Sequence, residues 1–433
     1  MFKYRKSFAA ILTAGVALGA ASLANAQSTS PFFLHDGDSV VMYGDEITNQ
    51  GLYTVDTQAF VQSRFPKIKL SWHNAGWDGD SATGNPYWWG GGDVNTRLDR
   101  DVTPCHPDVM TVLLGNNDGG NKEFNADKLG EFTRGYRHIL DKTALDDHNK
   151  VRFTLITPAA YDDVNHKPDF AGGYNGTLEK YAERVGEVAR QAGAVAVDLH
   201  GSMTDMLVKS RSLDPEVSKK IMDDNRSKPN AGAHVFIASQ IVKTWGMTRA
   251  VSDVAIDAAV GVVTKSENAR VTMTSRKGIL AWTETEGSLP LPIDFTDPAT
   301  ALVIKSSDIV DNLDQENLKV ANLTGSSYVL AIDGASIGAF TASQLSGGIN
   351  LATLQTPMLA QSMKLVQLAR AQFEIESEAV HNLQIWHLHY DAPGVNDDVK
   401  KVIADLHKAS TIAQDSAAKT AQPVVHKFTL TPQ

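Results

Sequence analysis

The sequence predicts an α/β domain with a five-stranded parallel sheet, followed by a small β module and a helical tail. From about residue 36 to 248, strand-like apolar runs alternate with helical patterns, which indicates three layers with helices on both faces of the sheet. The run Val109–Leu114 is continuously apolar, as expected for a strand that is buried on both sides. Beyond Gly246 the chain becomes rich in Thr, Val, Ser and Ile with recurring turn signals, which predicts separate β structure.

Five short runs are predicted to form the parallel sheet. They are Ser39–Tyr43, Lys67–Trp72, Val109–Leu114, Val151–Thr157 and Val195–Leu199. Helical patterns cover Phe124–Leu140, Leu178–Ala192 and Val235–Trp245. In parallel α/β sheets, ligands bind beyond the carboxyl ends of the strands. The residues that follow these runs are therefore the first candidates for a functional site.

The C-terminal half is predicted to contain a β module at residues 249–350 and a helical region at 351–433. Tyr328–Asp333 and Ser336–Thr341, joined at Gly334, are typical of a β-hairpin. Long helical patterns cover Pro357–Trp386 and Asn396–Ala418, and residues 424–430 are compatible with a strand. The first domain would then span residues 27–248, after a leader peptide.

The first 26 residues are typical of a secretory signal peptide. Lys3, Arg5 and Lys6 give a positive start, an apolar stretch follows, and Ala24-Asn25-Ala26 supplies small residues for cleavage before Gln27. A membrane anchor is the alternative, but the apolar stretch is interrupted and short for a span. We therefore expect a secreted or periplasmic bacterial protein with no integral membrane segment after cleavage.

Charge and cysteine content narrow the possible partners. The chain has 40 basic and 50 acidic residues, and removal of the leader would leave 37 and 50, a net charge of −13. This balance argues against nucleic acid, because phosphate binding requires a basic surface. Cys105 is the single cysteine, which excludes an intrachain disulfide and a thiolate zinc cluster. No cofactor or metal is predicted.

Four short motifs come after the predicted strands and before the last helix of the α/β domain. They are Gly44-Asp45-Glu46-Ile47-Thr48, Asn74-Ala75-Gly76-Trp77, Gly115-Asn116-Asn117-Asp118 and Asn225-Arg226-Ser227-Lys228-Pro229. In this order they resemble the sequence blocks of the GDSL, or SGNH, hydrolases. The resemblance implies a flavodoxin-like fold and hydrolysis of acyl esters, often on carbohydrates or lipids. It also implies that the backbone N–H of Gly76 and the side chain of Asn117 are donors of an oxyanion hole.

The three triad positions of that family carry other residues in this chain. The resemblance places the nucleophilic serine at Glu46, the acid at Asn225 and the base at Lys228. Serine ester hydrolysis needs a hydroxyl, an imidazole and a carboxylate. The replacements therefore predict loss of the serine mechanism. A salt bridge between Glu46 and Lys228 is the simplest structural interpretation.

Two catalytic alternatives remain open at the level of the sequence. A displaced triad would use Ser81 with Asp224 and either His234 or His200. A repurposed, glycosidase-like hydrolase would use Glu46 with a second carboxylate. The candidates for this second carboxylate are Asp45, Asp78, Asp80 and Asp118. Helix capping and loop orientation are the structural interpretation of the same aspartates.

A glycine-rich loop carries three aromatic residues that suit a flat ligand. Tyr87, Trp88 and Trp89 lie between Gly84 and Gly90, and aromatic faces of this kind stack on sugar rings. Packing of the loop onto a neighbouring domain is an equally good interpretation.

The sequence favours an exported protein that binds a small molecule or a glycan and has lost the serine-esterase triad. The glycosidase-like reaction and the displaced triad are the second and third interpretations. His387 and His389 have a spacing suited to a metal, but packing is favoured because no third ligand is evident.

Overall fold

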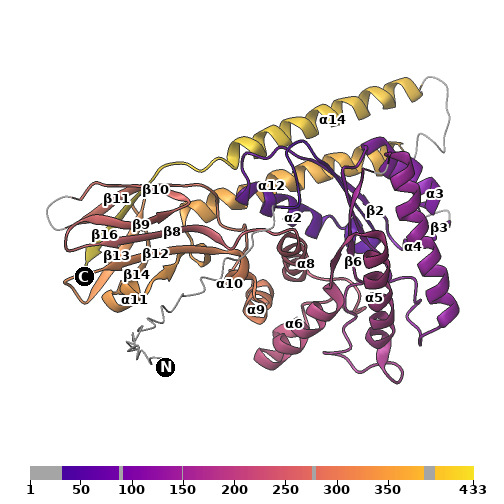
Figure 1. Cartoon of the computed structure of the whole chain (residues 1–433), viewed down its shortest axis with the longest axis horizontal. Helices are drawn as coiled ribbons and strands as arrows, with labels where there is room; N and C mark the ends of the chain where they lie inside the picture. Colours follow the sequence, from indigo (N-terminus) through magenta and orange to yellow (C-terminus); the bar gives the residue numbers. More distant parts are fainter. Residues whose placement is uncertain (1–31, 87–90, 149, 276–278, 385–394) are drawn as a thin grey trace, which may run out of the picture. The chain divides into compact units, whose positions relative to one another are not determined.

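A five-stranded parallel sheet organises the N-terminal half of the chain (Figure 1). The structure, a computed structural model, describes residues 32–433 except 87–90, 149, 276–278 and 385–394, so the predicted signal peptide lies outside the described residues. The strands have the spatial order β2-β1-β5-β6-β7, which confirms the predicted α/β fold. Their bounds are β1 (Ser39–Gly44), β2 (Ser71–Gly76), β5 (Val109–Leu113), β6 (Arg152–Ile156) and β7 (Val195–Val197).

The second strand begins later than the sequence predicts. Its pairing with β1 starts at Ser71 opposite Ser39 and ends at Gly76 opposite Gly44, whereas the predicted strand was 67–72. The apolar alternation of 67–72 indicates burial, and Leu70 and Trp72 are buried. Burial alone does not set the register, which follows from the hydrogen bonds to β1.

Helices cover both faces of the sheet and complete the three predicted layers. Along β1, Val40 and Met42 face one hydrophobic core, whereas Val41 and Tyr43 face the other, as expected from the alternation of side chains along a strand. The first core is built with α2 (Leu52–Arg64), α6 (Leu199–Leu213) and α8 (Ala231–Thr244). The second is built with α4 (Ala126–Asp146) and α5 (Gly173–Ala192).

Several short elements shape the loops of this domain at the strand ends. They are α1 (Glu46–Asn49), β3 (Gly84–Asn85), β4 (Gly92–Asp93), α3 (Val94–Arg97), the π-helical turn η1 (Leu98–Val102), the 3-10 turn η2 (Thr103–Cys105) and α7 (Pro215–Ser218).

The predicted β module contains two sheets that share one hydrophobic core. Buried residues of both sheets, including Val254, Leu318, Trp282 and Phe428, belong to this core, and the rings of Trp282 and Phe428 stack at 5.1 Å. One sheet has the order β15-β12-β8-β9 and the other β10-β11-β16-β13-β14. Their bounds are β8 (Ala250–Asp257), β9 (Val262–Glu267), β10 (Ala269–Met273), β11 (Leu280–Glu286), β12 (Gln315–Ala321), β13 (Ser327–Ile332), β14 (Ala335–Thr341), β15 (Ile349–Asn350) and β16 (His426–Pro432).

The predicted hairpin is present as β13 and β14, which pair antiparallel. The strand β16, which the sequence places after the helical region, lies between β11 and β13. The predicted domain boundary at residue 350 thus places β16 in a different domain from the sheet that it completes. Conversely, α9 (Pro298–Ser306) and α10 (Ile309–Leu313) lie within the predicted range of the β module but contribute to the hydrophobic core of the α/β domain.

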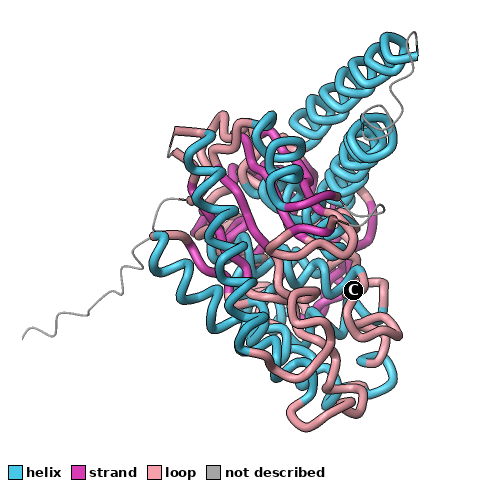
Figure 2. Tube along the Cα trace, turned by 90° about the vertical axis from the view of Figure 1, so that its right-hand side faces the viewer, coloured by secondary structure: helices cyan, strands magenta, loops and turns pink. Residues whose placement is uncertain are grey.

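Two long helices follow the β module and lie side by side in Figures 1 and 2. They are α12 (Pro357–Ser377), which continues into the π-helical turn η4 (Glu378–Gln384), and α14 (Val395–Thr420). α12 packs against α2 and against the edge strand β2. Before them come α11 (Ala342–Gly347) and the 3-10 turn η3 (Leu351–Thr353). Within the described ranges, no helix combines the length and apolar character that a bilayer crossing requires.

Candidate functional site

The first motif forms a tight turn from β1 into α1 and places Glu46 at the carboxyl end of the sheet. Asp45 caps α1, because its Oδ1 accepts a hydrogen bond of 3.0 Å from the N–H of Ile47. Gly44 is required at the strand end, since a Cβ there would lie 2.2 Å from Oγ1 of Thr48 and 2.6 Å from the carbonyl oxygen of Leu113. Backbone and helix cap together fix the direction in which the Glu46 side chain leaves the strand.

The Glu46 carboxyl group is held by two donors from different loops. Its Oε2 accepts a hydrogen bond of 2.7 Å from Nδ2 of Asn117, which follows β5, and one of 3.3 Å from the N–H of Gly79, which follows β2. Only 8% of Glu46 is exposed. A backbone N–H and an asparagine amide therefore converge on one oxygen of this side chain, as donors do in an oxyanion hole.

The predicted backbone donor is corrected from Gly76 to Gly79. The N–H of Gly76 donates to Oδ1 of Asn74 at 2.9 Å and is not directed at Glu46. Gly76 is instead required for close packing, because a Cβ there would lie 2.2 Å from the backbone nitrogen of Asn49. Gly79 has a positive φ of 69°, in the left-handed region that glycine adopts without strain, and this turns its N–H toward the site.

The predicted salt bridge between Glu46 and Lys228 does not form. Among the described residues, these two side chains make no ion pair, and Glu46 is bound to Asn117 and Gly79 instead. Lys228 lies in a turn that is held by Asp223, whose Oδ1 accepts the N–H groups of Ser227 and Lys228, both at 3.0 Å.

The position of the family's acid is equally unsuited to a triad. Asn225 is exposed in the turn before α8, and its Nδ2 lies 3.5 Å from Oδ2 of Asp223. The side chain that a triad would direct toward the base therefore faces its own turn.

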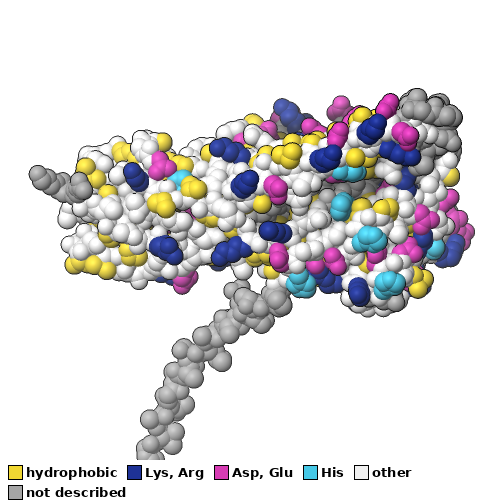
Figure 3. All heavy atoms as spheres, turned by 90° about the horizontal axis from the view of Figure 1, so that it is seen from above, with side chains coloured by type: hydrophobic (Ala, Val, Ile, Leu, Met, Phe, Trp, Pro, Cys, Tyr) yellow, Lys and Arg dark blue, Asp and Glu magenta, His cyan; other side chains and the backbone are white. Residues whose placement is uncertain are grey.

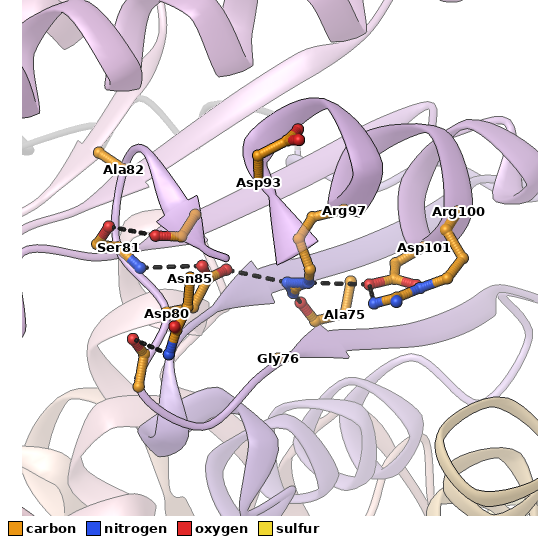
Figure 4. A network of polar contacts seen from close by, with 12 residues as sticks. Ala75, Gly76, Asp80, Ser81, Ala82, Asn85, Asp93, Arg97, Arg100 and Asp101 are labelled. Atoms are coloured by element: carbon orange, nitrogen blue, oxygen red, sulfur yellow. Dashed lines mark hydrogen bonds and ion pairs between the residues drawn. The ribbon is translucent and has the colours of Figure 1, made fainter. Parts of the chain in front are cut away.

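A buried arginine, Arg97, forms an ion pair with Asp80, one of the candidate carboxylates (Figure 4). Nη1 of Arg97 lies 2.9 Å from Oδ2 of Asp80, and Nε lies 3.0 Å from Oδ2 of Asp101. Arg97 also donates to the carbonyl oxygen of Ala75 at 2.5 Å, and its guanidinium lies 4.8 Å from the ring centroid of Tyr43. Asp80 therefore anchors the loop after β2 and is not available as a second catalytic carboxylate.

The other candidate carboxylates have separate structural positions. Oδ1 of Asp118 accepts the N–H of Ala82 at 3.0 Å, and burial raises the pKa of Asp118 to about 7. Burial, followed by the neighbouring Glu46, raises the pKa of Asp45 well above its ordinary value. Asp78 is exposed and accepts a hydrogen bond of 3.1 Å from Asn49. Asp45 thus caps a helix, and Asp118 orients the loop that contains Ala82.

The structure does not bring together the residues of a displaced triad. Ser81 Oγ contacts the carbonyl oxygen of Gly84 at 2.9 Å and Oγ1 of Thr83 at 3.2 Å. His234 is buried in α8, where Nδ1 accepts the N–H of Tyr53 at 3.2 Å and Nε2 lies 2.7 Å from Oε1 of Gln50. Burial lowers the pKa of His234 to about 3, so it is a neutral structural residue at pH 7.

The remaining predicted residues give no further support to a triad. His200 is the second residue of α6 and is buried, with its N–H bound to Oγ1 of Thr157 at 2.8 Å. Asp224 is exposed in the turn before α8. The aromatic residues Tyr87, Trp88 and Trp89 lie outside the described residues, as do His387 and His389.

A cavity of about 470 Å³ lies beside the Glu46 partners. Most of its lining side chains are polar, and it includes both Gly79 and Asn117. Its other lining residues are Ser81, Thr83, Gly84, Asn85, Pro86, Asp118, Lys128, Glu131 and Phe132. Within the described ranges, no group of three His, Cys, Asp or Glu residues is arranged to hold a metal ion. The arrangement can therefore hold a polar ligand through hydrogen bonds.

Comparison with known proteins identifies the α/β domain. Residues 37–216 match the GDSL-like lipase/acylhydrolase family. Over these residues the chain is similar to the GDSL, or SGNH, hydrolases. No curated protein matches the sequence.

Solved structures show that the fold extends beyond the family domain. A gut microbial diltiazem-metabolizing enzyme is 23% identical, with a TM-score of 0.76 over 92% of this chain and 98% of that chain. A protein described as a GDSL-like lipase from Parabacteroides merdae is 16% identical and covers 50% of this chain and 98% of its own, with a TM-score of 0.40. The first similarity shows a shared fold over nearly the whole chain.

Sequence reasoning missed Gly79, Arg97 and Lys128. The Asp78-Gly79 pair is a turn signal that predicts a positive φ, and it could have indicated the second donor. Arg97 and Lys128 lie outside the four motifs, Arg97 on the short helix α3 and Lys128 in the first turn of α4. A local sequence pattern does not indicate that these two residues lie close to the motifs in the fold.

Proposed function

We propose that this chain is an exported GDSL-family protein that binds carbohydrate or acylated carbohydrate at the Glu46 site and does not hydrolyse esters by a serine mechanism. The observation that carries the proposal is the pair of hydrogen bonds from Asn117 and Gly79 to Oε2 of Glu46. Export rests on the leader-like residues 1–26.

The loss of ester hydrolysis follows from what the two donors contact. Donors in these positions serve an esterase by stabilising the negative oxygen of a tetrahedral intermediate. Here the protein's own side chain takes that place, so the donors are not free for a substrate oxygen. The hydroxyl nucleophile and the imidazole base are also replaced, at Glu46 and Lys228. The occupied donors, the missing hydroxyl nucleophile and the missing imidazole base each oppose serine ester hydrolysis.

Polar lining of the adjacent cavity supports a ligand rich in hydroxyl groups. Hydroxyl, amide, carboxylate and ammonium groups all line it, at Ser81, Asn117, Glu131 and Lys128 among others. A volume of about 470 Å³ lies within the range of small-molecule pockets. The sequence adds aromatic residues directly after the lining residue Pro86.

An ester-hydrolysis assay tests the first half of the proposal. The wild-type protein is expected to turn over neither 4-nitrophenyl acetate nor diltiazem above the rate in buffer, because removal of a triad nucleophile or base costs about six orders of magnitude in rate. Release of 4-nitrophenol and loss of diltiazem are followed by absorbance and chromatography. Turnover that Ser81→Ala abolishes and Glu46→Gln leaves intact would overturn the proposal in favour of a displaced triad.

The glycosidase-like alternative is tested with the same variants. A panel of aryl glycosides is expected to remain intact, because Asp80 is bound to Arg97 and Asp118 to Ala82. Hydrolysis that is lost in Glu46→Gln would instead support carboxylate catalysis.

Carbohydrate binding is tested with Lys128, which lines the cavity and forms an i,i+3 pair with Glu131 at 2.9 Å. Acetylated and deacetylated oligosaccharides are screened on an array, and the best probe is titrated by calorimetry. Lys128→Ala is expected to weaken binding about tenfold, which corresponds to about 1.4 kcal/mol for one lost charged hydrogen bond.

A matched control exists on another helix. Lys180 forms the same i,i+3 pair with Glu183 at 2.9 Å on α5 and does not line the cavity. Lys180→Ala is expected to leave the affinity unchanged. Equal weakening by both variants, or no oligosaccharide that binds, would contradict the proposed carbohydrate site.

A further inference from the structure

A second cavity, of about 370 Å³, lies between the edge strand β2 and the helices α12 and α14. It shares no lining residue with the cavity beside Glu46. Glutamines of α14 and of the turn after it bind the chain just before β2, since Nε2 of Gln414 donates to the carbonyl of Leu70 and Nε2 of Gln422 donates to that of Pro66. The second cavity is thus built where the two helices cover an otherwise open sheet edge.

One part of the second cavity is apolar and contains two aromatic side chains. Met42 of β1, Trp72 of β2 and Val55 of α2 lie on the side of the α/β domain. Phe373 of α12 and Val380 of η4 lie on the side of the long helices. An aromatic side chain on each side provides flat surfaces for a planar ligand, and such surfaces favour stacked or edge-to-face contacts.

The polar part of the cavity contains three imidazoles. Burial lowers the pKa of His73, and it lowers that of His381 to about 4, so both are neutral at pH 7. Nδ1 of His407 lies 3.1 Å from Oε2 of Glu376. A neutral imidazole offers one N–H donor and one acceptor nitrogen. Figure 3 shows histidine side chains gathered on the face on which α14 lies.

The positive charge of Arg100 in the lining is matched within the protein, and Glu376 accepts a hydrogen bond from His407. Arg100 is bound to Asp101 through Nε at 2.5 Å and Nη2 at 2.8 Å. The amide Nε2 of Gln58 donates to Oε1 of Gln372 at 2.8 Å. The positive charge of Arg100 is therefore balanced and does not favour an anionic ligand.

His381 also connects the second cavity to the end of β2. Its ring stacks on that of Trp77, with centroids 4.6 Å apart, and the guanidinium of Arg100 lies 4.8 Å from the Trp77 ring. These stacked groups hold η4 against the α/β domain. The polar end of the cavity is therefore positioned by the fold itself.

We propose that the second cavity binds an uncharged, flat aromatic molecule that carries a hydroxyl group or a ring nitrogen. The aromatic part lies between Trp72 and Phe373, and the polar group is bound by the imidazoles of His73 and His381. The site is independent of the carbohydrate site at Glu46.

Calorimetric titration of the full chain with 2-naphthol, which is neutral at pH 7, tests this proposal. Saturable binding to one site is expected. Ser377→Trp, which places a bulky group among the lining residues, is expected to weaken it at least tenfold. Lys364→Trp is the matched control on the exposed side of α12 and is expected to bind as the wild type does. Val380→Phe is a second filling variant for use if Ser377→Trp does not fold.

A charged analogue and a variant of the first site complete the test. 2-Naphthoate is expected to bind at least tenfold more weakly than 2-naphthol, because Arg100 is already bound to Asp101 and Glu376 repels a carboxylate. Lys128→Ala is expected to leave 2-naphthol binding unchanged, because Lys128 lines the other cavity. Absence of 2-naphthol binding, equal binding of 2-naphthoate, or unchanged binding in folded Ser377→Trp and Val380→Phe variants would each overturn the proposal.

Discussion

Replacement of Arg97 by methionine is expected to lower the free energy of unfolding by about 3–5 kcal/mol. Arg97 is fully buried and forms ion pairs with Asp80 and Asp101. The substitution leaves both carboxylates buried without their partner, and this is the costly part of breaking a buried pair. The carbonyl of Ala75 also loses its donor, which adds the cost of an unsatisfied polar group.

Urea unfolding followed by circular dichroism measures this loss. Arg184→Met is the control, because Arg184 forms a surface i,i+3 pair with Glu187 at 3.0 Å and is 35% exposed. Its removal is expected to change the free energy of unfolding by less than about 1 kcal/mol. An Arg97→Met protein as stable as the wild type would show that the Asp80 network does not hold the loop after β2.

A rise in pH from about 6.5 to 8.5 is expected to destabilise the protein by at least about 3 kcal/mol, with about 1.4 kcal/mol per pH unit for each carboxyl group that stays protonated only in the folded state. Several of the groups responsible lie in the β module, and Asp45 and Asp118 of the α/β domain act in the same sense. Burial raises the pKa of Glu284 to about 7 and that of Glu286 to about 8. Burial and the neighbouring Glu286 raise the pKa of Glu316 well above its ordinary value. Burial raises the pKa of Asp314 to about 7 although Arg64 opposes it.

The direction of the effect follows from proton binding. Above about pH 5 the unfolded chain has lost the carboxyl protons that the folded protein retains, because unperturbed Asp and Glu have pKa values near 4. The folded state therefore binds more protons, and stability falls as the pH rises through the raised pKa values. Buried histidines such as His234 act in the opposite sense, but only below about pH 6.5, where an exposed imidazole gains its proton.

Unfolding in urea at several pH values measures the slope, and Glu316→Gln tests its origin. Glu316 is fully buried, and its carboxyl group forms a side-chain hydrogen bond with that of Glu286. The neutral amide is expected to reduce the slope and to stabilise the protein at pH 8.5. Glu183→Gln, on the surface of α5, is expected to leave the slope unchanged. A wild-type stability that is flat or rises between these pH values would contradict the assignment.

The strands and long helices could be predicted because their patterns are local. The apolar run at Val109–Leu114 corresponds to β5 at Val109–Leu113. The helical pattern at 396–418 corresponds to α14 at Val395–Thr420. The start of β2 was misplaced because hydrogen bonds to β1 set the register, and the partner strand is not visible in a local window.

Of the residues that form the site, only those within the sequence motifs could be predicted. Glu46 and Asn117 follow strands that are neighbours in the sheet, so their convergence follows from the topology. Opposite charge predicts Lys228 as the partner of Glu46, and this prediction is wrong because Lys228 lies in the turn that Asp223 holds. The role of Asp80 depends on its ion pair with Arg97. Arg97 lies on the short helix α3, which carries none of the motifs, so the sequence does not indicate this contact.

The position of β16 imposes an order on the biogenesis of the chain. Residues 426–432 supply the middle of a sheet whose other strands are complete by residue 341. While the ribosome synthesises the intervening segment, β11 and β13 each retain an open edge, and such edges pair readily with other chains. The β module therefore closes only after its last strand is made, so this part of the nascent chain stays incompletely folded until synthesis is nearly complete.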